Sequence, residues 1–558
     1  MYNRRMQAIQ DALKKVLESR GIIDGGTTLE FASDLSHGDL SSNAALQYAK
    51  ELKLSPRALA EALVAEMGSI PGILKIDVAG PGFINFTLES SHLAKILAEG
   101  REQGGGWGKN ESLLGKEVMV EYTDPNPFKA FHIGHLMSNA IGESLARLKE
   151  FAGAKVIRAN YQGDVGVHIA CAIWGMQKLA IKPTSADEFG RAYAEGATAY
   201  KENQEAKAEI DSINKKIYDR SDTALNALYD MGREESLAAF ERIYALLGTK
   251  FDRYFFESET GPKGKEIVLA NPEVFPESDG ARVFKGEEHG LHTRVFLNSQ
   301  QLPTYEAKEL GLEKLKTELF PHAEMLYIVT ASEVVEYFRV VKKSMEQIFP
   351  EIAAKLVHVP HGMMKLPEGK MSSRTGKVIT GESLISDLVA VAHERASESR
   401  AEDPAKLAQD IAVAAIKFQI LRGGTSKDII FERERALSVE GDSGPYLQYA
   451  HARCQAIGEK AQEQGVIGVF DAAATPSDLA RLLIRFPAIV HRAERELEPH
   501  HVANYLIQVA AAFNSWYAQE QILDGSGGAP HKVALTDITR LTLKNGLWLL
   551  GIPAPEKV

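Results

Sequence analysis

Cysteine is scarce in this sequence, since only Cys171 and Cys454 occur among 558 residues. Such a count excludes a disulfide-rich scaffold, and no cysteine pair has the spacing of a zinc site. We therefore expect a protein of a reducing compartment, the cytoplasm. We predict no protein-bound zinc and assign no metal ligands.

Long apolar runs and an excess of basic charge are also missing. No stretch approaches the ~20 apolar residues of a membrane span, and residues 1–15 lack the apolar core of a secretory signal. Lys and Arg number 64 against 75 Asp and Glu, so the net charge is −11. This balance argues against a globally basic surface for nucleic acid, although it leaves room for a local basic track.

The remaining composition is that of a folded, multidomain chain, with 44% hydrophobic and 25% charged residues. Residues 1–105 predict a small α+β domain. It has a helix over 4–17, a second helix after Ser41 and Ser42, and strands at 74–78 and 83–88 joined by an Ala-Gly-Pro-Gly turn. The glycine-rich stretch 104–108 is typical of a linker.

Residues 112–380 predict a second domain with a parallel sheet. A strand at 117–123, a helix at 132–151 and a strand at 155–160 form a βαβ unit. Strands at 293–297, 325–330 and 356–359, alternating with helices, are expected to continue this pattern. Residues 178–290 are polar and helix-rich, which indicates a helical insertion. Residues 381–558 predict an all-α domain.

The strongest motif is His132-Ile133-Gly134-His135, which follows a predicted strand and opens a helix. A helix N-terminus offers free backbone N–H groups and the positive end of the helix dipole, which suit phosphate. The two imidazoles are three residues apart and share one face. Gly134 leaves room for a flat base. Two incidental histidines are the alternative, which the strand–loop–helix context disfavours.

A second motif, Lys370-Met371-Ser372-Ser373-Arg374-Thr375-Gly376-Lys377, follows the last strand of the βαβ pattern. A loop with lysine and small hydroxyl residues can close over polyphosphate and neutralise its charge. Taken alone, such a segment is more often an ordinary solvated basic loop. The order and pairing of the two motifs favour the functional interpretation.

The two motifs resemble the HIGH and KMSKS signatures of class I aminoacyl-tRNA synthetases, and the chain more narrowly resembles the arginyl-tRNA synthetases. The resemblance covers nearly the whole chain. It rests also on HGDLSSNAALQYAK at 37–50, GPGFINFTL at 80–88, DPNPFKAFHIGHL at 124–136, VIRANYQGDVGVHI at 156–169, TYEAKEL at 304–310, GDSGPYLQYAHAR at 441–453 and LKNGLWLLGIPAPEKV at 543–558.

This resemblance implies a multidomain α/β fold: an α+β tRNA-contacting domain, a Rossmann-type catalytic domain with a helical insertion, and an all-α anticodon-binding domain. It implies activation of L-arginine by ATP with Mg²⁺ and transfer to the 3′ end of tRNA(Arg) by a monomeric enzyme. Lys370 would join His132 and His135 in catalysis. The implied ATP contacts are His132, Gly134, His135, His361, Met371 and Ser372.

The planar guanidinium of arginine needs an anionic partner. Tyr305 and Glu309 are four residues apart on a predicted helix, so both face one site, where Glu309 would pair the guanidinium. A solvated helix carboxylate is the alternative for Glu309. Asn160 ends a predicted strand, where sheet enzymes place ligand contacts. The resemblance adds Asn126 for polar groups of the amino acid, Asp164 for its α-ammonium and Glu333 for closing the pocket.

Two positions depart from the family pattern. Glu309 stands where the family more often has Asp, and Ser373 stands where the loop usually carries its second lysine. One phosphate-neutralising charge is therefore unaccounted for. Lys129, three residues before His132, is a catalytic candidate to supply it, and a flexible surface lysine is the alternative.

The C-terminal region carries the candidate tRNA contacts. Aromatic and basic groups on one helix can stack on unpaired bases and contact phosphates, although packing inside a helical core is the commoner role. These residues are Tyr446, Tyr449, His451 and Arg453.

Three other functions compete with this interpretation. A synthetase for a neutral amino acid would leave Glu309 unpaired, which is costly. A small HIGH-type nucleotidyltransferase would not need the outer domains. A non-catalytic RNA-binding paralogue would not need His132, His135 and Lys370.

Overall fold

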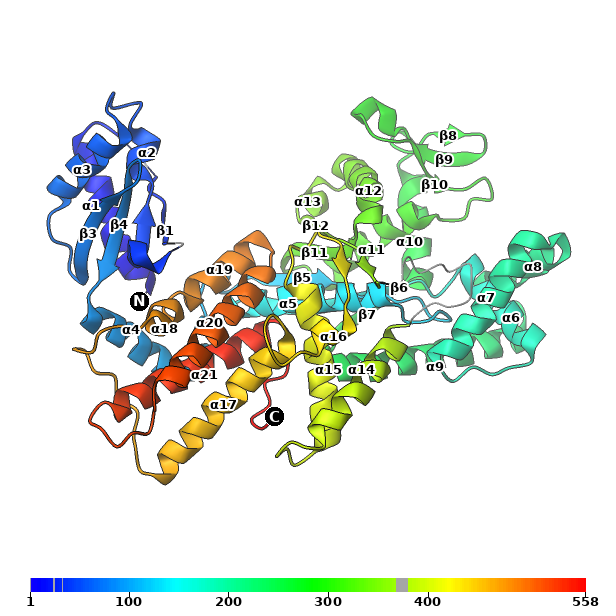
Figure 1. Cartoon of the computed structure of the whole chain (residues 1–558). Helices are drawn as coiled ribbons and strands as arrows, with labels where there is room; N and C mark the ends of the chain where they lie inside the picture. The colour runs from blue at the N-terminus through cyan, green and yellow to red at the C-terminus, as the bar shows by residue number, and fades with distance from the viewer. Residues whose placement is uncertain (1, 24–25, 33, 368–379) are drawn as a thin grey trace.

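The computed structural model describes residues 2–23, 26–32, 34–367 and 380–558 of the chain. The N-terminal α+β part, the central α/β part and the helical C-terminal part are visible in Figure 1. The predicted fold class is confirmed, because the central part contains a parallel sheet covered by helices on both faces.

The N-terminal part packs helices against a four-stranded antiparallel sheet of order β1-β2-β4-β3. Its elements are α1 (Tyr2–Ser19), β1 (Leu29–Phe31), β2 (Leu40–Ser42), α2 (Ala44–Tyr48), α3 (Pro56–Met67), β3 (Ile73–Ala79) and β4 (Phe83–Leu88), followed by α4 (Ser90–Gln103). The turn between β3 and β4 contains Gly80 with φ 53° and Gly82 with φ 143°, a left-handed backbone that glycine adopts without strain.

The central sheet has five strands in the order β12-β11-β5-β6-β7, and all four pairings are parallel. The strands are β5 (Glu117–Glu121), β6 (Lys155–Gln162), β7 (Arg253–Phe256), β11 (Ala323–Ala331) and β12 (Leu356–His361). Side chains alternate between the two faces of a strand. On β5, Val118 and Val120 join the core beneath α5, whereas Met119 joins the core beneath α11.

The central part also contains helices, some of which cover this sheet. They are α5 (Ile133–Phe151), α6 (Val167–Leu179), α7 (Ala186–Glu202), α8 (Gln204–Asp219), α9 (Thr223–Leu247), α10 (Glu257–Ala270), α11 (Tyr305–Leu319), α12 (Val335–Ile348) and α13 (Pro350–Ala353). Helices α6, α7 and α8 extend away from the sheet with a core of their own (Figure 1).

Two sequence predictions for this part are wrong. The strand predicted at 293–297 forms as β10 (Arg294–Leu297), but it pairs antiparallel with β9 (Ala281–Phe284) and β8 (Glu277–Ser278) in a separate sheet. The predicted helical insertion also contains β7, the edge strand of the central sheet. With only four residues, β7 is too short to show a clear period within a helix-rich segment.

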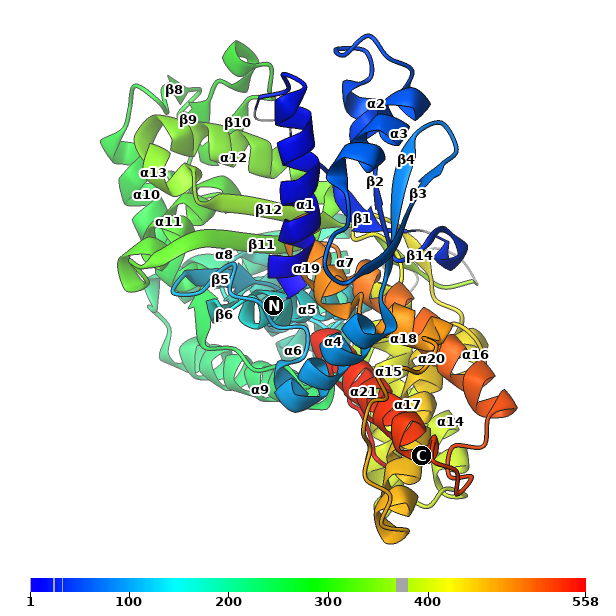
Figure 2. The ribbon, with the colours of Figure 1, turned by 90° about the vertical axis from the view of Figure 1, so that its left-hand side faces the viewer.

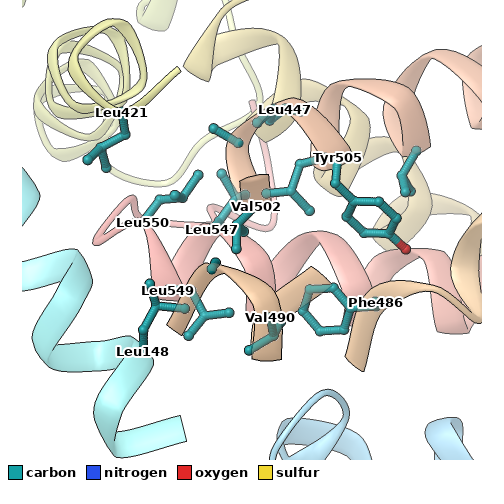
Figure 3. Packing of buried hydrophobic residues seen from close by; sticks show 14 of the residues in the cluster. Leu148, Leu421, Leu447, Phe486, Val490, Val502, Tyr505, Leu547, Leu549 and Leu550 are labelled. Carbon is teal, nitrogen blue, oxygen red and sulfur yellow. The ribbon is translucent and has the colours of Figure 1, made fainter. Parts of the chain in front are cut away.

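The C-terminal part is almost all helical, as predicted. It contains α14 (Gly381–Ala396), α15 (Pro404–Leu421), α16 (Arg433–Ala436), α17 (Gly444–Glu463), α18 (Asp478–Leu483), α19 (Phe486–Glu496), α20 (His500–Gln519) and α21 (Ala529–Leu549). Its one short strand, β14 (Ile429–Ile430), pairs with β13 (Met364–Lys365) of the central part. In Figure 3, Leu148 on α5 lies against Leu549 at the end of α21.

The three parts are joined by buried contacts. Lys149 on α5 forms an ion pair of 2.6 Å with Glu494 on α19, and both side chains are buried. The predicted linker is packed, because Trp107 is buried and its Nε1 donates to Thr542 on α21 at 3.0 Å. The N-terminal part lies beside α18 and α19 (Figure 2), where Arg485 donates to the carbonyl of Ala32 at 2.9 Å.

Candidate functional site

The histidine motif lies where the chain leaves β5 and enters α5. His132 is the N-cap of α5, and its Nδ1 accepts a hydrogen bond from the N–H of Gly134 at 3.1 Å. The Nδ1 of His135 accepts from the N–H of His132 at 3.1 Å. A Cβ placed on Gly134 would lie 3.0 Å from the His132 ring, so glycine is the residue that leaves this ring undisturbed.

These bonds determine which ring nitrogen carries the proton. Because each Nδ1 accepts, each neutral ring carries its proton on Nε2. Desolvation by the surrounding protein lowers the pKa of His132 to about 4, assisted by Lys129, although the side chain is still exposed to ligand. Burial, then His132, Lys129 and His361, lower the pKa of His135 well below its ordinary value. Both imidazoles are therefore neutral Nε2–H donors at pH 7.

Two further predicted residues, His361 and Lys129, lie near these histidines. His361 ends β12, is buried and lies within electrostatic range of His135. The Nζ of Lys129 is 4.9 Å from the centre of the Tyr193 ring on α7, and burial lowers its pKa. The helix N-terminus is thus surrounded by His132, His135, His361 and Lys129, which can together meet a polyanion.

Lys370, Met371 and Ser372 lie outside the described residues, as does the rest of the second motif. The chain is described again from Thr380, which pairs with His132 through an isolated antiparallel bridge. The N–H of Gly381 donates to the carbonyl of Phe131 at 2.6 Å. Thr380 and Gly381 are therefore held beside the first motif.

Glu309 on α11 belongs to a buried cluster of charged side chains. Its Oε2 accepts from the hydroxyl of Tyr337 on α12 at 3.3 Å, and its Oε1 has no hydrogen-bond partner in the described part of the chain. Lys316 lies 2.7 Å from Oε2 of Glu121 and also pairs with Glu313. Lys316 thus pairs with two carboxyl groups, Glu121 and Glu313, and the carboxyl group of Glu309 is left without an ion pair among the described residues.

This excess of carboxyl groups favours a cationic ligand. Burial, followed by the nearby Glu121 and Glu313, raises the pKa of Glu309 well above its ordinary value. Asp124 adds a fourth carboxyl group, which is partly exposed and whose pKa is likewise raised by desolvation and by Glu121. Tyr305 begins α11 one turn before Glu309, and its side chain is exposed. A guanidinium entering past Tyr305 would supply the missing positive charge.

Sequence reasoning missed Glu121, Glu313, Lys316 and Tyr337. Two signals were available. Glu121 ends the apolar strand β5, where a buried carboxylate needs an explanation. Glu313 and Lys316 follow Glu309 by four and seven residues, on the same helix face. Tyr337 gave no local signal, because its contact with Glu309 arises from the packing of two helices.

Asn126, Asn160 and Glu333 are also predicted to contact the amino acid, and they lie in different parts of the central domain. Asn126 accepts from the N–H of Gly163 at 2.8 Å. Asn160 is buried, and its Nδ2 donates to the carbonyl of Tyr122 at 3.1 Å. Glu333 is exposed on a short 3₁₀ turn (Ser332–Val334) directly after β11.

Asp164 already has several partners within the protein. It accepts from Nε of Arg233 at 3.0 Å and from the N–H and hydroxyl of Ser258 at 2.9 and 2.8 Å. It is 1% exposed. These contacts favour a role in positioning the start of α10 over a direct contact with the α-ammonium.

The family comparisons identify this arrangement. The family model described as "tRNA synthetases class I (R), catalytic domain" matches residues 92–433, more than half of the chain. The chain belongs to this family, the arginyl-tRNA synthetases of class I. An "Arginyl tRNA synthetase N terminal domain" model matches residues 5–88, and a "DALR anticodon binding domain" model matches residues 447–558.

Curated relatives agree over nearly the full length. The chain is 31% identical over 528 residues to an arginine–tRNA ligase of Clostridium perfringens, covering 92% of this chain and 93% of the relative. It is 31% identical over 566 residues to an arginine–tRNA ligase of Lactococcus lactis subsp. cremoris, covering 99% of each.

Solved structures of synthetases share the fold. The arginyl-tRNA synthetase of Thermus thermophilus superposes with a TM-score of 0.78 at 24% identity. That of Plasmodium falciparum superposes with a TM-score of 0.77 at 20% identity. Both comparisons cover 99% of each chain.

The predicted tRNA contacts of this arginyl-tRNA synthetase family member lie on α17. The guanidinium of Arg453 lies 4.9 Å from the Tyr449 ring and 5.3 Å from the Tyr517 ring, and both tyrosines are partly exposed. Asn514 on α20 donates to the hydroxyl of Tyr446 at 3.0 Å and accepts from Arg453 at 2.6 Å. This group presents an aromatic and cationic surface to a ligand.

His451 differs from its neighbours on α17. It is 1% exposed, and its Nδ1 hydrogen-bonds the carbonyl of Pro555 at 3.0 Å. A buried ring cannot stack on a base at the surface, so we leave His451 out of the proposed tRNA contacts. Its place on the same helix as exposed aromatics made the two roles indistinguishable in sequence.

Among the described residues, no group of three or more His, Cys, Asp and Glu side chains is arranged to hold a metal ion. In the same part of the chain, every helix is too short or too polar to cross a membrane.

Proposed function

We propose that this chain ligates L-arginine to tRNA(Arg) in two steps, as a cytoplasmic monomer. ATP enters as its Mg²⁺ complex. A carboxylate oxygen of arginine attacks the α-phosphorus and expels pyrophosphate, leaving arginyl-adenylate. A terminal ribose hydroxyl of the tRNA then attacks the adenylate carbonyl and releases AMP. We assign tRNA contact to residues 1–105, catalysis to 112–380 and anticodon binding to 381–558.

The buried carboxyl cluster is the observation that carries the choice of substrate. Glu309 is 5% exposed and holds one oxygen without a partner among the described residues. A neutral side chain would leave this oxygen unsatisfied in a desolvated pocket, whereas a guanidinium satisfies it and neutralises its charge. Tyr305 would line the same pocket, and Asn126 and Asn160 would hold polar groups of the amino acid.

His132 and His135, whose rings stack with centroids 3.6 Å apart, carry the second part of the proposal. Their Nε2–H groups and the N-terminus of α5 would bind the phosphates and stabilise charge that develops as pyrophosphate leaves. Gly134 and His361 would border the adenine, together with Met371 and Ser372. Lys370 would neutralise the phosphates from the second motif. No covalent intermediate on the protein is needed, since positioning and charge stabilisation suffice for such displacement.

Charging of total tRNA with each of the twenty amino acids tests this function. We expect arginine alone to be attached. The family resemblance further implies that arginine activation needs bound tRNA, because tRNA on the outer domains would shift the catalytic domain to its active state. Arginine-dependent ATP–pyrophosphate exchange should then be near background without tRNA. Robust exchange in RNA-free protein would refute this dependence, and charging with another amino acid would refute the substrate.

A further inference from the structure

Tyr337 connects the two residues that the proposed function assigns to the arginine side chain. It lies in the first turn of α12, which packs against α11. Its hydroxyl is 3.0 Å from the carbonyl oxygen of Tyr305 and 3.3 Å from Oε2 of Glu309, and these two acceptors share its one proton. The ring is held by an edge contact with Phe338 at 5.1 Å. One hydroxyl therefore ties the start of α11 to the carboxyl group one turn later.

This contact decides which oxygen of Glu309 is left for a ligand. Oε2 is engaged by Tyr337, whereas Oε1 is buried and has no partner in the described ranges. Buried polar atoms without partners are rare, because each costs free energy. Lys316 pairs with Glu121 and Glu313, and no ion pair joins it to Glu309 among the described contacts. Oε1 is therefore the atom at which an N–H of a guanidinium would complete the site.

We propose that Tyr337 is a specificity-determining residue for arginine, which acts by positioning Glu309 so that Oε1 receives the guanidinium. This inference rests on the proposed function. Without the hydroxyl, the Glu309 side chain would lose its fixed rotamer and the first turn of α11 would lose its tie to α12. A carboxylate that samples several positions pairs less well with a planar guanidinium, because the N–H directions of the guanidinium are fixed.

The hydroxyl also affects the charge of Glu309. Burial, Glu121 and Glu313 raise the pKa of Glu309, while Lys316 and the hydrogen bond from Tyr337 oppose this rise. Loss of the hydroxyl should raise the pKa further, so Glu309 would keep its proton to a higher pH. The protonated carboxyl is a poor partner for a cation. The charged and titratable groups around this pair are Glu121, Asp124, Tyr161, Arg294, Glu306, Glu313 and Lys316.

Steady-state charging of tRNA by the full chain tests the inference between pH 6.5 and 8.5. Tyr337→Phe removes one oxygen and keeps the ring, so we expect a folded protein. The KM for arginine should rise about tenfold, with a larger rise at pH 6.5 than at pH 8.5. The kcat and the KM for ATP should stay within about twofold. Tyr254→Phe is the matched control, since its hydroxyl contacts Glu241 at the surface, away from the cluster.

A double-mutant cycle separates action through Glu309 from a general effect. Tyr337→Phe should have a much smaller effect in a Glu309→Gln background, because the side chain it positions then carries no charge. An unchanged KM for arginine at both pH values would overturn the inference, as would equal changes in the KM for ATP. Wild-type protein that does not charge tRNA with arginine would instead overturn the proposed function.

Discussion

The imidazole rings of His132 and His135 stack with their centroids 3.6 Å apart and 18° between their planes. Each Nδ1 is occupied by a backbone N–H of the same helix start. One nitrogen of each ring therefore completes the cap of α5, and the other remains for a ligand. The two roles belong to different atoms and can be separated by substitution.

Asparagine and glutamine distinguish these roles at His132. The Oδ1 of asparagine can cap the helix in place of Nδ1 but has no group at the Nε2 position, whereas glutamine places its amide farther out. We expect His132→Asn to fold normally and to form arginyl-adenylate about 10²–10³-fold more slowly, as for loss of one transition-state donor. His132→Gln should recover part of that rate. Single-turnover activation with tRNA bound measures both.

His135→Ala should show a similar loss of rate, with little change in arginine binding. Because the pKa of His132 is lowered to about 4, the ring stays neutral from pH 8 down to pH 6. The activation rate should therefore not change over this range through His132. Rates within a few-fold of wild type for the His132 and His135 variants would contradict the assignment.

The sequence predicted most of the fold because the decisive signals are local. The strand, helix and strand at 117–160 carry their periods and turns within the βαβ unit itself. The strand β10 was assigned to the wrong sheet, because pairing depends on which edge the chain reaches and not on the composition of four residues. The edge strand β7 was missed for another reason, because its four residues show no clear period within a helix-rich segment.

In the candidate site, too, the local contacts were predictable from sequence and the long-range contacts were not. His132, Gly134 and His135 lie within four residues at a helix start, so their contacts follow from a single turn. The groups that surround Glu309 come from β5, α11 and α12, and these elements are far apart in sequence. Tyr337 reaches Glu309 only because α12 packs on α11, and such contacts are not encoded in any one segment.

Glu309→Gln tests the anionic partner of arginine. The glutamine amide keeps the shape and can still accept from Tyr337, but it carries no charge. We expect a higher KM for arginine and a smaller preference for arginine over citrulline, its neutral isostere. Competition assays of tRNA charging measure this ratio. Glu318→Gln, near the end of the same helix and exposed, is the control. Unchanged discrimination against citrulline would show that another carboxylate reads the guanidinium.

Substitutions of His451 and Tyr449 on α17 should have different effects, the first on the stability of the protein and the second on its affinity for tRNA. Burial lowers the pKa of His451 to about 4, below the ~6.5 of an unfolded histidine. The unfolded state therefore binds more protons between these values, and stability falls as pH falls from 6.5 to 4. His451→Gln should flatten this fall in thermal unfolding and leave tRNA affinity unchanged at pH 7.5.

Tyr449→Ala should behave in the opposite way. Its ring is 40% exposed beside Arg453, and loss of one stacking ring typically weakens RNA binding by about tenfold or more. The melting temperature should change little. For both variants, filter binding measures the affinity for tRNA and thermal unfolding measures the stability. A loss of tRNA affinity in His451→Gln with unchanged stability would show that His451 contacts tRNA, as the sequence predicts.

Lys129 is predicted to supply the positive charge that the second motif lacks at Ser373. Negative charge builds on the α-phosphate and the departing pyrophosphate during activation, and Lys370 alone remains in the usual lysine positions. The ammonium of Lys129 is close enough to His132 and His135 to lower the pKa of both. Lys129→Ala should therefore slow activation without unfolding the protein or weakening tRNA binding.

A second lysine in the motif tests whether Lys129 replaces the missing one. Ser373→Lys should recover part of the rate in the Lys129→Ala background and have a smaller effect in the wild type, because both side chains serve the same charge and are then not additive. Lys178→Ala is the control, since Lys178 also lies over an aromatic ring, Trp174, at 5.9 Å. If Lys129→Ala leaves activation unchanged, or Ser373→Lys gives the same factor in both backgrounds, Lys129 is an ordinary lysine packed on Tyr193.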